Sequence, residues 1–160
     1  MMAMGRGKGG YTTIQTGYRD SGGRKVTDPG SVFVAERYID AGYESVFRQR
    51  HEPQKTYDLT IKTSDDSEYV KNIEVKRLTS NNPSVMAKRI GEAFTQFSSG
   101  REDTVAIVLP NLKNNGKGLQ FAKDGYSEAL RKGFVKGNVE VWFSDKTKIE
   151  FIGGKQKWHD

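Results

Sequence analysis

The chain has 160 residues, contains no cysteine and carries a formal net charge of +6 at pH 7. The absence of cysteine excludes disulfide frameworks, thiolate zinc sites and thiol nucleophiles. No apolar run approaches the roughly 18 residues of a membrane-spanning helix, so we expect no membrane span. The positive charge favours an anionic partner such as nucleic acid, although basic and acidic residues alternate almost throughout the chain.

The first thirty residues are rich in glycine, serine, threonine and basic residues and have few apolar positions. A segment of this composition contributes little to a hydrophobic core. We therefore expect residues 1–30 to be a flexible lead-in or linker. The remaining length suits one core, so residues 31–160 are expected to form a single domain.

A helix is predicted over residues 31–41, with Asp28 or Ser31 as its N-cap and Gly42 ending it. Residues 43–50 alternate loosely between apolar and polar and suit a strand. The domain is thus expected to open with a helix followed by a strand.

A β-hairpin is predicted next, because residues 57–63 and 69–76 both alternate and a polar segment joins them. If the turn is centred on Asp66, antiparallel pairing places residue 63 opposite residue 69 and Asp58 opposite Glu74. The Cβ atoms of two directly opposed residues lie about 4.5–5.5 Å apart. The hairpin therefore predicts two neighbouring carboxylates.

The second half of the chain predicts two helices, a buried strand and a terminal hairpin. Apolar residues recur at one-face helical spacing from Pro83 to Phe97, before Gly100. A short continuous apolar run stopped by Pro110 fits a strand buried on both faces. The predicted ranges are a helix from 83, a strand at 104–109, a loop of Asn, Gly and Lys, a helix at 119–134, and hairpin strands at 139–143 and 148–152.

Side chains alternate faces along a strand, so Glu74 and Lys76 share one face while Ile73 and Val75 point to the other. We expect the charged face to have a small role in packing. Two facing carboxylates repel, and a divalent cation held between Asp58 and Glu74 would remove the repulsion. Hard oxygen ligands suit Mg²⁺ or Mn²⁺, with Zn²⁺ as a third candidate. The alternative is a solvated sheet face with ordinary surface charges.

Two short motifs, Tyr57-Asp58-Leu59 and Glu74-Val75-Lys76, together resemble the PD-(D/E)xK nuclease superfamily. The first departs from the family pattern, which often has proline where Tyr57 stands. The resemblance covers residues 31–109 and implies a core of helix, three strands, helix and strand. It thus implies a mixed α/β fold, a central mixed sheet flanked by helices, to which a C-terminal helix and β-hairpin are added. Its implied activity is metal-dependent hydrolysis of phosphodiester bonds.

The resemblance also implies two further site residues. Glu36 would be the acidic residue of the first helix and a metal ligand, and Gln96 the polar residue of the second helix. For both, an ordinary helix-surface position is the alternative. Several basic residues near the proposed site suit contacts with phosphates, or are ordinary surface charge. The candidates for nucleic-acid binding are Lys62, Arg77, Lys88 and Arg89.

More narrowly, residues 72–82, the helix containing Gln96 and residues 105–109 are similar to the C-terminal toxin domains of contact-dependent growth-inhibition and related polymorphic toxins. That similarity implies delivery as part of a larger secreted or cell-surface effector, action in the cytoplasm of a target bacterium, and neutralisation by a cognate immunity protein. Both DNA and tRNA are candidate substrates. We favour tRNA slightly, because a compact basic domain can hold folded RNA through its shape and phosphates. The alternatives are a restriction or repair endonuclease, or a non-catalytic nucleic-acid-binding module on the same fold.

Overall fold

The structure is a computed structural model of the chain. It describes residues 3–6, 18–20, 22–48, 57–63, 65, 69–97, 103–152 and 155–159, and their side chains except at 3–6, 69 and 155–159. Contacts divide the chain into two compact units, Met1–Ile73 and Glu74–Asp160. The boundary falls inside a strand, β4 (Tyr69–Arg77). The single domain predicted over residues 31–160 therefore stays a prediction, and each unit is described by itself.

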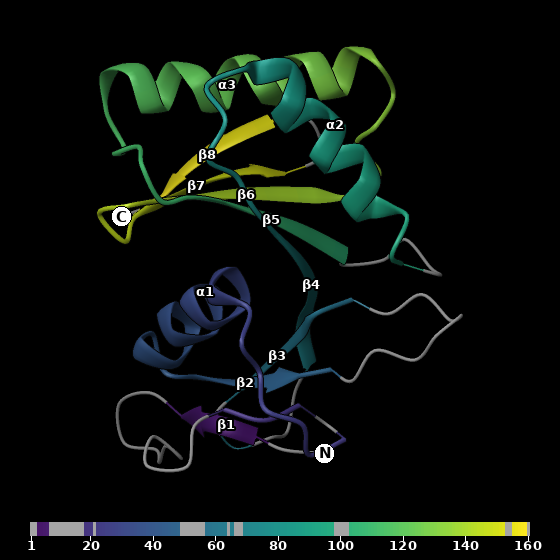
Figure 1. The fold of residues 1–160 in the computed structure, drawn as a ribbon, viewed down its shortest axis with the longest axis vertical. Helices are drawn as coiled ribbons and strands as arrows, with labels where there is room; N and C mark the ends of the chain where they lie inside the picture. The colour runs from purple at the N-terminus through teal and green to yellow at the C-terminus, as the bar shows by residue number, and fades with distance from the viewer. Residues whose placement is uncertain are drawn as a thin grey trace. The chain divides into compact units, whose positions relative to one another are not determined.

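Unit 1 consists of one helix on an antiparallel sheet. Its elements are β1 (Ala3–Arg6), α1 (Pro29–Asp40), β2 (Tyr43–Phe47), β3 (Leu59–Thr63) and the first part of β4. The strands lie in that order, and each neighbouring pair is antiparallel. Helix α1 lies along one face of β2 and β3 (Figure 1).

Helix α1 begins as the sequence predicts. Asp28 is the N-cap, and its Oδ2 accepts hydrogen bonds from the backbone N–H of Ser31 at 3.1 Å and from its hydroxyl at 2.6 Å. This cap satisfies a helix N–H group that has no partner within the helix. Gly42 follows the helix with φ of 98°, a conformation that side chains with a Cβ rarely adopt.

The predicted hairpin register is confirmed over three residue pairs. Leu59 lies opposite Ile73, and the pairing continues through Thr60 with Asn72 and Ile61 with Lys71. Thr60 donates a hydrogen bond from Oγ1 to Oδ1 of Asn72 at 3.0 Å across the ladder. A register shift then follows, so Tyr69 lies opposite Lys62 rather than opposite Thr63 as predicted. The predicted turn centre, Asp66, lies outside the described residues.

The predicted lead-in contributes described structure to unit 1. Strand β1 pairs with β2, and Tyr18 packs its ring at 5.6 Å from the ring of Phe47. A bridge also joins Asp20 to Phe47. The strand pairing and the bridge are made by the backbone, so the polar, glycine-rich composition of the segment gives little indication of them.

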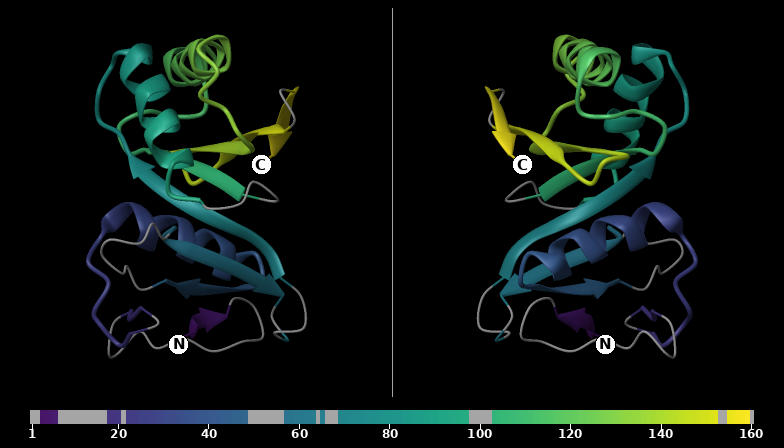
Figure 2. Two further views of the ribbon diagram at one scale, coloured as in Figure 1. Left: turned by 90° about the vertical axis from the view of Figure 1, so that its right-hand side faces the viewer. Right: turned by 90° about the vertical axis from the view of Figure 1, so that its left-hand side faces the viewer.

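Unit 2 is a mixed sheet with two helices on one face (Figures 1 and 2). From the end of β4 the strand order is β4-β5-β6-β7-β8. The pair β5–β6 is parallel, whereas β6–β7 and β7–β8 are antiparallel, so a mixed α/β fold is confirmed. Its other elements are α2 (Pro83–Phe94), β5 (Asp103–Leu109), α3 (Gly116–Arg131), β6 (Asn138–Phe143), β7 (Lys148–Ile152) and β8 (Lys155–His159).

Strand β5 is buried at all seven positions, as its continuous apolar run predicts. Helix α3 connects it to the parallel strand β6, and α2 packs against both α3 and β5. The core between these elements includes Met86, Ile90, Ile107, Tyr126, Val141 and Phe151. Tyr126 stacks on Phe151 with ring centroids 3.9 Å apart.

Helix boundaries in unit 2 differ from the predictions at three points. Helix α2 ends at Phe94, whereas its apolar spacing predicted a helix through Phe97; the predicted end at Gly100 lies outside the described residues. Helix α3 begins at Gly116, inside the segment predicted to be a loop, and ends at Arg131 rather than at Phe134. Glycine and asparagine are ordinary loop signals, so the sequence gives no helical pattern for the first turn of α3, which includes the buried Gly118.

Among the described residues, no helix is both long and apolar enough to span a bilayer, in agreement with the absence of long apolar runs.

Candidate functional site

Strand β4 carries the acidic and the basic residue of the second motif. Lys76 Nζ lies 3.8 Å from Glu74 Oε2, so the two side chains share a face of the strand, as alternation predicts. The Lys76 side chain is 24 % exposed, whereas that of Glu74 is fully buried. In such an arrangement the partly accessible ammonium can donate a charge-assisted hydrogen bond to an anionic group that reaches it.

The burial of Glu74 corrects one expectation. The sequence predicted that the charged face of this strand would have a small role in packing, yet Ile73, Glu74 and Val75 are all buried. The strand is therefore covered on both faces at Glu74. Burying a carboxylate is unfavourable unless it is paired or hydrogen-bonded, and the ammonium of Lys76 provides one such partner.

Asp58 lies directly before β3 in unit 1. Its backbone N–H donates to the carbonyl of Ile73 at 3.0 Å, and its own carbonyl accepts from the N–H of Arg48 at 2.8 Å. The predicted ladder pair between Asp58 and Glu74 spans the boundary between the two units and stays a prediction. Within unit 1, the backbone of Asp58 is bonded to the residue that immediately precedes Glu74.

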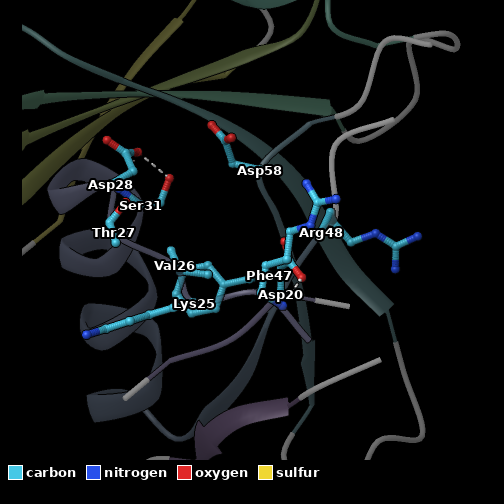
Figure 3. Close-up of a pocket in the computed structure, with 10 residues that line it drawn as sticks. Asp20, Lys25, Val26, Thr27, Asp28, Ser31, Phe47, Arg48 and Asp58 are labelled. Carbon is cyan, nitrogen blue, oxygen red and sulfur yellow. Dashed lines mark hydrogen bonds between the residues drawn. The ribbon is translucent and has the colours of Figure 1, made fainter. Parts of the chain in front are cut away.

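A cavity of about 230 Å³ in unit 1 contains Asp58 in its wall, and we call it the Asp58 cavity. Figure 3 shows its lining, which comes from the segment before α1, the start of α1, the end of β2 and the residue before β3. Its charged lining residues are Asp20, Arg24, Lys25, Asp28, Arg48 and Asp58. No sequence motif marks Arg24 or Arg48, because basic residues occur throughout the chain.

Glu36 lies on α1 and is half-buried. Its Oε2 accepts a hydrogen bond from the hydroxyl of Tyr18 at 3.1 Å. Burial, followed by the neighbouring carboxylate of Glu36, raises the pKa of Tyr18 to about 12. The role of Glu36 as a metal ligand stays a prediction, and the structure adds a tyrosine hydroxyl as its partner.

The remaining predicted residues lie at element ends and on strand and helix surfaces. Gln96 follows α2 in a turn, half-buried, with its backbone N–H donating to the carbonyl of Ala93 at 3.1 Å. Lys62 is half-buried on β3, while Arg77 and Lys88 are exposed. Arg89 is exposed on α2 and pairs with Glu92 at 3.5 Å. Contact of these residues with nucleic acid stays a prediction.

A pair of facing carboxylates occurs on the β6–β7 hairpin, where Glu140 lies directly opposite Glu150. Lys148 lies 2.8 Å from Glu150 and 3.8 Å from Glu140, and the indole of Trp142 donates to Glu140 at 2.8 Å. Here a lysine offsets the repulsion between cross-strand carboxylates. No sequence motif marks this cluster, although a hairpin centred on Asp145 predicts its register.

Binding of a divalent cation by Asp58, Glu74 and Glu36 stays a prediction. In the part of the chain that the structure describes, no three or more Asp, Glu, His or Cys side chains gather as a metal site. Mg²⁺, however, is commonly held by one or two carboxylates together with water and substrate phosphates.

Comparison of the chain with protein-family models, with curated proteins and with solved structures found no match.

Proposed function

We propose that this chain is a metal-dependent endonuclease of the PD-(D/E)xK type, with Asp58, Glu74 and Lys76 as its catalytic residues. The observation that carries the proposal is the placement of Glu74 and Lys76, two residues apart on one face of β4 with 3.8 Å between their charged atoms. The order of the elements supports it, because α1, β2, β3, β4, α2 and β5 follow one another as helix, three strands, helix and strand.

The proposed residues have distinct roles in phosphodiester hydrolysis. Asp58 and Glu74 would hold the cation, and Lys76 would neutralise charge that develops on the phosphoryl oxygens. A bound divalent cation supplies polarisation of the phosphoryl group and a water of lowered pKa. Water adds to phosphorus, one P–O ester bond breaks, and the departing alkoxide takes up a proton. Glu36 and Gln96 are proposed as further residues of the site.

We further propose that the nuclease is a toxin delivered into competing bacteria within a larger effector, that it acts in the target cytoplasm, and that an immunity protein neutralises it. tRNA is the favoured substrate over DNA. A fold does not determine its substrate, so this preference depends on the compact size and positive charge of the chain.

The test is cleavage by the purified chain of total tRNA and of supercoiled plasmid, each with Mg²⁺, with Mn²⁺ and with chelator. We expect cleavage with metal, loss of cleavage in chelator, and faster cleavage of tRNA. Plasmid cleavage alone would favour the restriction or repair alternative. Binding of either polymer without cleavage under any of these conditions would favour the non-catalytic module and contradict the proposal.

A further inference from the structure

We infer that the Asp58 cavity is a phosphate-binding subsite, in which Arg24 and Arg48 contact backbone phosphate oxygens of a nucleic-acid strand. The inference assumes the proposed function, because it takes Asp58 as a catalytic residue. It assigns a role in substrate binding to part of residues 1–30, which the sequence predicts to be a lead-in.

The position of Arg48 beside Asp58 is set by the backbone. The N–H of Arg48 donates to the carbonyl of Asp58 at 2.8 Å, so the residue that ends β2 and the residue that precedes β3 are bonded to each other. The Arg48 guanidinium carbon lies 5.9 Å from the ring centroid of Tyr57. Both Arg48 and Asp58 line the cavity and are half-buried (Figure 3).

The position of Arg24 is set by a tight turn. Asp20 Oδ1 accepts hydrogen bonds from the backbone N–H groups of Gly22 at 2.9 Å and Arg24 at 3.0 Å, and Gly23 has φ of 84°. The bridge from Asp20 to Phe47 holds this turn against the end of β2, one residue before Arg48. Arg24 is therefore held at the cavity by the hydrogen bond of its backbone N–H to Asp20.

The cavity wall has three basic and three acidic side chains, and local hydrogen bonds occupy two of the acidic ones, which leaves the arginines as groups that can bind an anion. The carboxylate of Asp20 is used by its turn, and that of Asp28 caps α1. Within the described residues, neither Arg24 nor Arg48 forms an ion pair. The planar guanidinium matches two phosphate oxygens at once, so two arginines beside the proposed catalytic carboxylate suit a phosphodiester of RNA or DNA.

The test compares the double variant Arg24→Ala/Arg48→Ala with a control double variant, Arg131→Ala/Lys132→Ala. The control loses the same charge, but from unit 2. Both residues of the control are exposed on or next to α3 and pair with Glu128. Binding of fluorescein-labelled tRNA, a single-stranded DNA oligonucleotide and its duplex is measured by anisotropy in chelator, at several salt concentrations. Circular dichroism checks that each variant is folded.

We expect the arginine variant to bind more weakly. The slope of log K against log salt is negative, and its magnitude should decrease by about 1.4 for single strands or about 1.8 for duplex DNA, corresponding to two lost phosphate contacts. The control should leave the slope near that of the wild type. Weaker binding of tRNA by the variant identifies RNA as the source of the phosphate, and weaker binding of the oligonucleotides identifies DNA. If Arg48→Ala fails to fold, the exposed Arg24→Glu variant carries the same test.

An unchanged slope in the arginine variant, or an equal decrease in the control, would overturn the subsite. The proposed function would fail by a different result, namely no cleavage of nucleic acid by the wild type in the presence of metal. Cleavage combined with an unchanged slope would therefore contradict the subsite alone.

Discussion

At the scale of single residues, two buried glutamates in unit 2 occur beside a lysine, and only one of them is proposed to be catalytic. Glu140 is held by Lys148 and Trp142 and faces Glu150, whereas Glu74 has Lys76 at 3.8 Å. A lysine, together with an indole N–H, can thus stabilise facing carboxylates without a metal. Strand alternation was enough to predict that Glu74 and Lys76 share a face. The burial of Glu74 was not predictable, because it depends on groups that are distant in sequence.

A buried aspartate at the start of β5 should make stability depend on pH. Asp103 is 3 % exposed, and burial raises its pKa above the ordinary 3.8. The pKa of Asp103 is higher in the folded protein than in the unfolded chain. Its favourable contribution to stability is therefore complete below pH 3.8 and is lost as the pH rises through the folded pKa. Asp103→Asn should therefore raise the Tm at pH 7, by about 2–4 °C for each kcal/mol gained. This gain should disappear near pH 3.

At Asp145 we expect substitution by asparagine to change the Tm at pH 7 in the opposite direction, so this residue provides the comparison. The Thr147 hydroxyl donates to Asp145 at 2.6 Å and lowers the pKa of this carboxyl. Its contribution is present above pH 3.8 and is lost as pH falls through the folded value. Asp145→Asn should thus lower the Tm at pH 7, and this difference should shrink as the pH falls below 3.8. Parallel pH profiles of Tm for the two variants would contradict both assignments.

At the scale of elements, local sequence patterns were sufficient to predict a helix or strand where the element has a cap or a buried face. Asp28 and Asn82 cap the helices that the sequence predicts, and the apolar run of β5 forms the expected buried strand. Strands β1 and β8 were missed. The segment of β8 is mostly polar and has little apolar alternation, and it joins the sheet through backbone pairing with β7.

Gly125 is required by the close approach of α3 to α2. A Cβ at this position would lie 2.4 Å from Met86 Sδ and 3.0 Å from Met86 Cβ. Gly125→Ala should therefore destabilise the protein by about 1–3 kcal/mol through overpacking, although alanine is the better helix former. Urea unfolding followed by circular dichroism measures the change.

Ser127→Ala is the matched control, because Ser127 is exposed on the same helix and the change also introduces alanine. It should leave the unfolding free energy nearly unchanged or raise it slightly. Met86→Ala should cost less stability in the Gly125→Ala background than in the wild type, since the two positions are in contact and neighbouring changes are not additive. A Gly125→Ala protein as stable as the Ser127→Ala protein would show that the helices do not approach this closely.

At the scale of the whole molecule, the order of elements could be predicted from the sequence, and the assignment of residues to units could not. The predicted helix, three strands, helix, strand, helix and hairpin all occur. The contacts, however, divide the chain within β4, so Asp58 belongs to unit 1 while Glu74 and Lys76 belong to unit 2. Periodicity describes single elements, and neither the boundary nor the packing of the first thirty residues has a periodic signal.

The proposed nuclease activity is tested most directly by cleavage kinetics of two variants with Mg²⁺ or Mn²⁺. Glu74→Gln keeps the volume of the buried side chain and removes its charge, whereas Lys76→Ala removes the ammonium. The controls are Glu128→Gln and Lys132→Ala, which change another glutamate–lysine pair, 3.2 Å apart on the surface. Rates are measured on tRNA and plasmid with all four variants confirmed as folded.

We predict that each β4 variant loses at least about a hundredfold in rate, the range expected when a group that stabilises transition-state charge is removed. The two controls should cleave at the wild-type rate, and chelator should stop cleavage by all active proteins. Wild-type rates in Glu74→Gln or Lys76→Ala, or cleavage undiminished by chelator, would contradict the proposed nuclease site.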